Sequence, residues 1–154
     1  MKIKNLHFQN SLTKTPKLQN LIDQLQDLLS ELRSMDLPEE IIGYINTQIE
    51  EINSSDQSIK KFGKLLKNKT SSIVKIIESK LKIVPKNYYQ TFYMAIVMAA
   101  FGIPLGVAFG LAMGNMAFLG IGIPIGLALG IGIGTAMDQK ALKEGRQLKT
   151  TIKY

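Results

Sequence analysis

Three amphipathic stretches precede one long apolar stretch in this chain. Apolar residues from Leu18 to Leu32 recur at i, i+3, i+4 and i+7, which is the spacing of one helix face. This stripe predicts a helix from about residue 17 and is also compatible with a heptad coiled coil. Asp36-Leu-Pro38 ends it, because proline disfavours helical geometry in the residue before it.

Two further helices are predicted before the apolar stretch. The second begins at Pro38 and has Glu39 and Glu40 in its first turn, where acids interact favourably with the helix dipole. Residues 53–56 form a loop with capping side chains, and a third helix runs from about Gln57 to Val84, before Pro85. The two apolar stripes comprise Ile41, Ile42, Ile45, Ile49 and Ile52, and then Ile59, Phe62, Leu66, Ile73, Ile77 and Leu81.

Charge divides these helices sharply. Residues 18–56 contain nine acids and one base, whereas residues 57–86 contain nine lysines and one acid. One interpretation is a bundle in which the acidic helices pack beside the basic helix. The other interpretation places the basic helix on anionic lipid headgroups. The two interpretations are compatible if one face of the basic helix packs on the acidic helices and another faces the headgroups. No nucleic-acid partner is expected, because the lysines lack a recognition motif or interleaved aromatics.

Residues 87–137 contain no Asp, Glu, Lys, Arg or His. A membrane-spanning helix needs about 20 apolar residues, so this stretch predicts a transmembrane hairpin with spans at about 88–113 and 116–137. Gly114-Asn115 or the segment 118–120 supplies the turn. A buried hairpin in a soluble protein is the less favoured alternative, given the glycine content and the uninterrupted apolar length.

A glycine zipper occurs twice in the hairpin, offset by twenty positions. We expect the helices to pack through eight glycines, which are Gly102, Gly106, Gly110, Gly114, Gly122, Gly126, Gly130 and Gly134. Pro104 and Pro124 occupy matching positions and predict similar kinks. Small residues also recur two positions away, and two positions subtend about 200° of a helix. Each helix therefore has two opposite small faces, which predicts a homo-oligomer, because a single hairpin fills only one face of each helix.

Basic residues flank the predicted hairpin on both sides. Lys80, Lys82 and Lys86 precede it, whereas Lys140, Lys143 and Arg146 follow it. By the positive-inside rule, both termini are expected in the cytoplasm, and no cleavable signal peptide is expected. Tyr88 and Tyr89 fit an interfacial aromatic belt.

The segment 126–134 resembles the glycine-rich inner helix of rotary ATP synthase c subunits, which are two-helix hairpins that assemble into rings. It lacks their mid-membrane carboxylate, so only the packing logic is implied. The zipper is also similar to those of mechanosensitive channels, pore-forming toxins and uncharacterised bacterial glycine-zipper membrane proteins. This resemblance implies a location in the bacterial inner membrane.

Catalytic motifs are absent from the sequence. There is no cysteine, the single histidine is His7, and no phosphate-binding, nucleophile or metal motif occurs. We therefore expect no enzymatic activity, no cofactor and no metal.

The sequence thus predicts an all-α protein in four parts. These are a flexible N-terminal arm (1–16), a cytosolic helical domain (17–86), the hairpin (87–137) and a basic tail (138–154). The predicted function is an oligomeric membrane scaffold in contact with lipid, with a cytosolic protein as a candidate partner. The alternative is a non-selective pore.

Overall fold

The computed structural model describes residues 2–7, 15–55 and 59–152, which form two compact units. The first unit contains residues up to Pro85 together with the segment from Leu148, and the second contains Lys86–Gln147. The described residues are helical apart from short connections. The predicted all-α class is confirmed.

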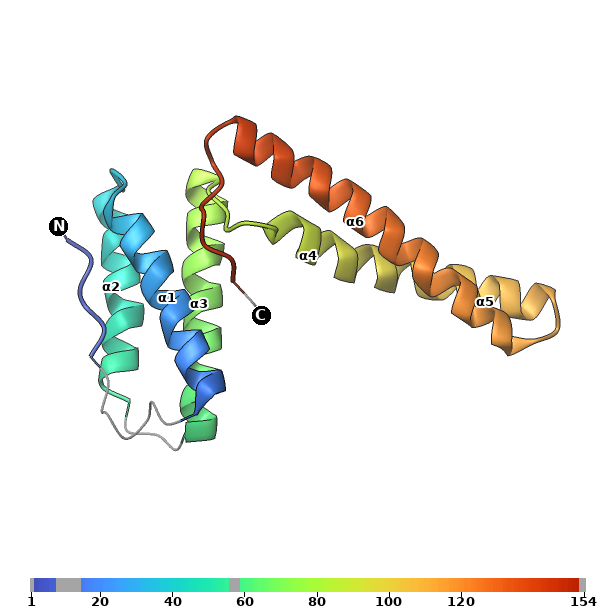
Figure 1. The fold of residues 1–154 in the computed structure, drawn as a ribbon, viewed down its shortest axis with the longest axis horizontal. Coiled ribbons are helices and arrows are strands. Elements are labelled where there is room, and N and C mark those ends of the chain that lie inside the picture. Colours follow the sequence, from blue (N-terminus) through green and yellow to red (C-terminus); the bar gives the residue numbers. More distant parts are fainter. Residues whose placement is uncertain (1, 8–14, 56–58, 153–154) are drawn as a thin grey trace. The chain divides into compact units, whose positions relative to one another are not determined.

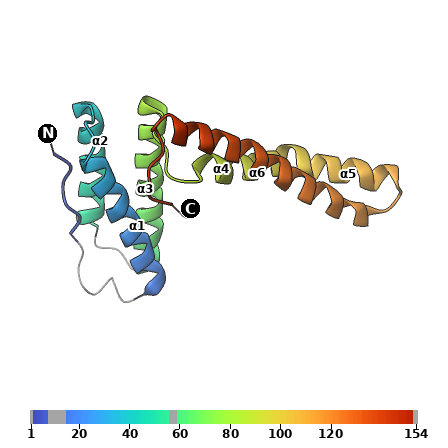
Figure 2. The same cartoon turned by 45° about the horizontal axis from the view of Figure 1, so that its top comes forward.

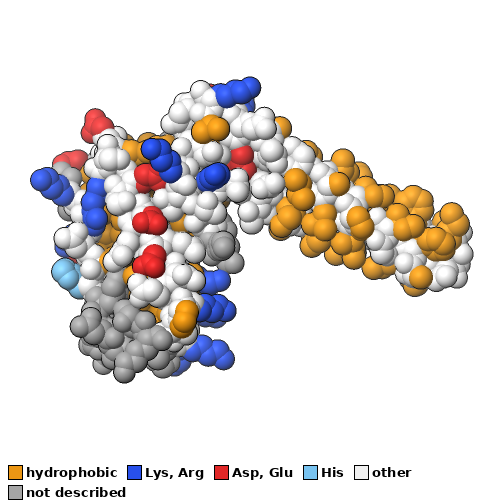
Figure 3. Space-filling view, in the orientation of Figure 1, with side chains coloured by type: hydrophobic (Ala, Val, Ile, Leu, Met, Phe, Trp, Pro, Cys, Tyr) orange, Lys and Arg blue, Asp and Glu red, His pale blue; other side chains and the backbone are white. Residues whose placement is uncertain are grey.

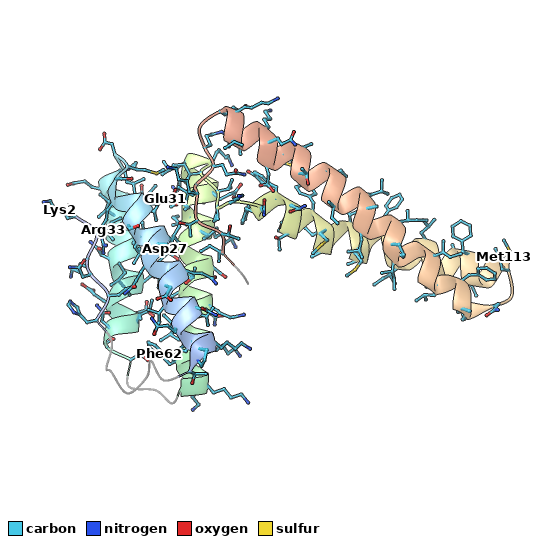
Figure 4. All side chains as sticks on the ribbon, viewed as in Figure 1. Lys2, Asp27, Glu31, Arg33, Phe62 and Met113 are labelled. Atoms are coloured by element: carbon cyan, nitrogen blue, oxygen red, sulfur yellow. The ribbon has the colours of Figure 1, made fainter. Side chains whose placement is uncertain are left out.

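The first unit is an up-down-up bundle of α1 (Pro16–Arg33), α2 (Glu39–Asn53) and α3 (Ile59–Leu81) (Figure 1). The three helices remain side by side when the molecule is turned (Figure 2). The predicted stripes form the core, where Leu25, Ile45 and Ile73 are fully buried. Phe62 is the largest of the fully buried side chains (Figure 4).

The third helix is shorter than predicted. It ends at Leu81, and Lys82 takes a positive φ of 58°. Val84 is then extended and buried, and its carbonyl oxygen accepts a hydrogen bond from the Leu148 amide at 2.8 Å. The chain therefore leaves the first unit and returns to it at hydrogen-bonded neighbours.

The described part of the N-terminal arm is bound, which corrects the prediction of a flexible segment. Two α2 asparagines hold it, each using its side-chain amide as a second peptide group. Asn46 accepts from the Lys4 amide and donates to the Lys2 carbonyl. Asn53 likewise accepts from the His7 amide and donates to the Asn5 carbonyl. Residues 1 and 8–14 of the predicted arm lie outside the described residues, and Pro16 already belongs to α1.

Two further contacts fix the ends of the first unit. Arg33 donates from its guanidinium to the Lys4 carbonyl at 2.7 Å, and Arg33 and Lys2 are labelled in Figure 4. On α1, the Glu31 carboxylate accepts from the Lys149 amide at 2.6 Å and from the Thr150 amide and hydroxyl at 3.0 and 2.7 Å. The C-terminal segment is therefore part of the helical domain and not a separate tail, and Leu148 and Ile152 are buried.

The second unit is a helical hairpin. Its first arm comprises α4 (Tyr88–Val97), a π-helical turn η2 (Met98–Gly102) and α5 (Ile103–Ala112). A short 3-10 turn, η3 (Met116–Phe118), leads into α6 (Leu119–Lys143). The last helix continues beyond the predicted end at residue 137, so the first charges after the apolar stretch lie on its final turns.

Candidate functional site

Glycines of both arms make the closest contacts between the two helices of the hairpin. Seven of the eight predicted zipper residues are buried there: Gly102, Gly106, Gly110, Gly122, Gly126, Gly130 and Gly134. A Cβ added at Gly126 would lie 2.7 Å from the Gly102 Cα, and one at Gly130 would lie 2.6 Å from the Tyr93 carbonyl oxygen. Only hydrogen fits at these positions, so the two backbones are in direct contact.

Gly114 is not part of this contact, contrary to the prediction. It is exposed, a Cβ there would meet nothing within 4 Å, and its φ is +64°. Its left-handed backbone ends the first arm, and the Asn115 side chain then accepts from the Ala117 amide at 2.9 Å. Gly114-Asn115 therefore starts the turn, near the labelled Met113 (Figure 4).

The second series of small residues lies on the outer faces of the hairpin. All of its members are exposed: Ala100, Pro104, Ala108 and Ala112 on the first arm, and Gly120, Pro124, Ala128, Gly132 and Ala136 on the second. A Cβ at Gly120 or Gly132 would meet nothing within 4 Å. The two small series thus occupy different surroundings within one hairpin, one closed against the partner arm and one open.

The two prolines are accommodated differently, although they occupy matching repeat positions. Pro104 opens α5, directly after the π-helical turn, in which the Ile103 amide bonds to the Met98 carbonyl. Such a turn relieves a proline locally, because it shifts the hydrogen bonds from i−4 to i−5. Pro124 lies inside the continuous helix α6. The two prolines therefore differ in their local backbone structure, and the similar kinks stay a prediction.

A buried carboxylate closes the open end of the hairpin. Asp138 of α6 is 5 % exposed and accepts from the backbone amides of Tyr89 and Gln90 at 3.1 and 2.9 Å. These amides lie in the first turn of α4, where backbone donors have no acceptor within their own helix, and Asn87 supplies no side-chain cap. Gln90 also donates to the Thr135 hydroxyl at 3.3 Å. Asp138 therefore caps the opposite arm and sets the register of the two helices.

Sequence reasoning missed this cap. Asp138 is the first charge after the apolar stretch, and a hairpin brings that position next to the start of the first arm. This placement was the available signal. The same reasoning overlooked Gln90, a polar residue inside the first predicted span.

Aromatic and basic residues surround the open end. Tyr88 stacks on Phe92, with ring centroids 6.2 Å apart, and packs edge-on against Tyr89. Arg146 donates to Glu144, and this hydrogen bond lowers the pKa of Glu144 and raises that of Arg146. The remaining predicted interface residues divide between the two units. Lys86, Lys140 and Lys143 belong to the hairpin, whereas Lys80 and Lys82 belong to the helical domain, where Lys80 pairs with Glu40 at 3.7 Å.

The outer surface of the hairpin is apolar along most of its length (Figure 3). Among the described residues, fifteen large hydrophobic side chains are exposed, and all but Tyr44 belong to this hairpin. Its two arms, 25 and 28 residues long with mean hydropathies of 2.2 and 2.1, are each long and apolar enough to cross a membrane. Only 17 % of either apolar window is buried, which distinguishes these helices from the core helices of a soluble domain.

Comparison with known proteins gave no match to a protein-family model, a curated protein or a solved structure. Among the described residues there is also no group of three or more His, Asp or Glu side chains placed to hold a metal ion.

Proposed function

We propose that this protein is an integral membrane protein whose hairpin crosses the bilayer twice and self-associates. In this role it is a scaffold that holds helical domains together at one membrane surface. The exposed apolar surface of the hairpin supports insertion, since contiguous apolar patches of this extent are rare on soluble monomers. A helix of 25 residues is about 37 Å long and exceeds the bilayer's hydrocarbon thickness of about 30 Å.

The open small face is the observation that carries self-association. In lipid, helices associate through close backbone approach more than through hydrophobic drive. The buried glycine series makes such close backbone contacts within the hairpin. The exposed series of small residues has the same spacing, and no part of the hairpin packs against it. A second copy of the hairpin offers a matching surface, and Gly120 and Gly132 allow backbone contact there.

The proposed location is the bacterial inner membrane, with both termini in the cytoplasm. The hydrogen bond between Val84 and Leu148 supports one side for both ends, since the chain leaves and returns at adjacent residues. The lysines and arginine on both flanks support the cytoplasmic side.

Disulfide cross-linking in native membranes tests self-association directly, because the natural chain has no cysteine. We expect Ala128→Cys, on the open small face, to give a covalent dimer on mild oxidation. Leu129→Cys is the matched control, because Leu129 is also exposed but lies about 100° further round the same helix, and it should cross-link much less. Equal cross-linking at the two positions would indicate random collision and refute a specific interface.

The pore alternative is tested by ion flux through liposomes that contain the purified protein. A scaffold gives no flux above protein-free vesicles. Ion flux through the natural protein that is lost in a Gly126→Leu/Gly130→Leu variant would refute the scaffold function and support a non-selective channel. Retention of the protein in the membrane after alkaline extraction tests insertion independently of both functions.

A further inference from the structure

The lysines of α3 separate into two sets in the folded domain. Lys69 forms an ion pair with Glu51, and Lys80 pairs with Glu40, so these two bases face the acids of α2. Lys60, Lys64 and Lys67 share another face, at i, i+4 and i+7. These three lysines form no ion pair with the residues that the structure describes. One set therefore stabilises the bundle, and the other leaves its charge available.

The second set surrounds a hollow between α1 and α3. The hollow has a volume of about 420 Å³, and Leu18, Leu21 and Gly63 form its apolar floor. Lys17 of α1 completes the basic rim, together with Lys60, Lys64 and Lys67. Gly63 leaves space at the centre, because a Cβ there would meet only the Leu18 Cδ1, at 3.7 Å. In Figure 3, blue side chains gather along the side of the domain on which α3 lies.

We propose that this lysine-rimmed hollow binds an anionic phospholipid of the bilayer that the hairpin spans. The inference rests on the proposed membrane insertion. Lysines near a membrane surface each contribute about 1 kcal/mol of attraction to anionic lipid, and an apolar floor beneath them accommodates part of an acyl chain. The volume lies within the range of about 300–1,000 Å³ that is typical of small-ligand sites.

Charge and tethering both favour lipid as the occupant. Two acids, Asp23 and Asp27, line an adjoining hollow that shares Lys17 and Lys67. Lys60 and Lys64 line the lysine-rimmed hollow and not the adjoining one, and the described lining of the lysine-rimmed hollow contains four lysines and no acid. A domain attached to its own membrane hairpin meets lipid at a high effective concentration. This site would hold the domain against the bilayer through α3 and restrict its orientation there.

The test uses the full chain in phosphatidylcholine vesicles, with a bimane probe on Thr15→Cys at the rim. Thr15 is exposed and makes no side-chain cap hydrogen bond, so the label replaces no interaction of α1. Acyl-brominated phosphatidylglycerol is titrated into the vesicles and compared with brominated phosphatidylcholine. We expect stronger quenching by phosphatidylglycerol, whereas a label on Thr47→Cys of α2 should show no such difference.

Two variants separate a built site from diffuse attraction. Lys60→Gln/Lys64→Gln should raise the lipid fraction for half-maximal quenching about fivefold per lysine. Lys61→Gln/Lys75→Gln removes the same charge from exposed positions outside the hollow. This control variant should change the lipid fraction for half-maximal quenching much less. Gly63→Leu fills the floor without changing the charge and should also weaken the phosphatidylglycerol effect.

Three outcomes would overturn the proposal. They are equal quenching by both lipids, equal losses in the two lysine variants, and no effect of Gly63→Leu. Alkaline extraction of the same vesicles is scored separately. Release of the protein would refute membrane insertion, whereas retained protein without headgroup-selective quenching refutes only the lipid site.

Discussion

Replacing Gly126 with alanine should weaken the hairpin, although the added group is a single methyl. The new Cβ would lie 2.7 Å from the Gly102 Cα and 3.1 Å from the Met98 Cα. Carbon atoms in ordinary contact are about 3.5–4.0 Å apart, so the two arms must separate by about 1 Å. Both neighbouring atoms belong to backbone, and no side chain can rotate away.

A gap of about 0.5–1 Å loses a quarter to a half of the attraction of each affected contact. Overpacking of this kind costs about 1–3 kcal/mol, and we expect a destabilisation in that range. Gly132→Ala is the matched control on the same helix, because its Cβ meets nothing within 4 Å. Its helix propensity improves by up to about 1 kcal/mol, so the hairpin should be equally or more stable.

The assay is resonance energy transfer between labels at Thr91→Cys and Gln139→Cys, one near the open end of each arm. The hairpin is unfolded by adding sodium dodecyl sulfate to protein in mild detergent. Gly126→Ala should lower the detergent fraction at the midpoint of the transition, and Gly132→Ala should leave it unchanged or raise it. Equal midpoints for the two alanine variants would refute backbone contact through the buried series.

Three other predictions concern contacts outside the zipper. Asp138→Ala removes the cap of α4 and should destabilise the hairpin by about 1–2 kcal/mol; hydrogen exchange at the Tyr89 and Gln90 amides should accelerate, and unchanged protection would contradict the cap. Burial raises the pKa of Glu31, but the bonds from Lys149 and Thr150 outweigh it and lower the pKa below the ordinary 4.5. The stabilising effect of these bonds is complete above that value and is lost as the pH falls through the lower folded pKa. A label on Thr151→Cys should therefore become mobile in acid. The same midpoint pH for this mobility change in a Glu31→Gln variant would refute Glu31 as its cause. Asn53→Ala removes two hydrogen bonds, each worth about 0.5–1.5 kcal/mol, and should increase proteolysis near His7, whereas Thr47→Ala should not.

Helical periodicity accounts for much of what the sequence predicted correctly. The stripes on α1, α2 and α3 specify their buried faces, because a 3.6-residue period selects one side of each helix. The same arithmetic placed the two small series on different faces of the hairpin arms. The predicted glycine series is also the one that closes the hairpin, with Gly114 at the turn as the exception.

The features that were missed depend on contacts between distant segments. Asn46 and Asn53 are ordinary polar residues of α2 until the N-terminal arm lies beside them. Asp138 becomes a cap only when α6 returns to the start of α4. The π-helical turn was also unforeseen, because Pro104 and Pro124 have the same sequence context and differ only in their position along a helix.

The number of copies of the full-length protein in lipid nanodiscs, counted by native mass spectrometry, tests the central claim most directly. Self-association through the open small face predicts an oligomer. It also predicts that Gly132→Leu reduces the oligomer to monomers while the hairpin remains folded, since a side chain at Gly132 meets no atom of the other arm. A natural protein that is monomeric in lipid, or an oligomer unaffected by Gly132→Leu, would contradict the account.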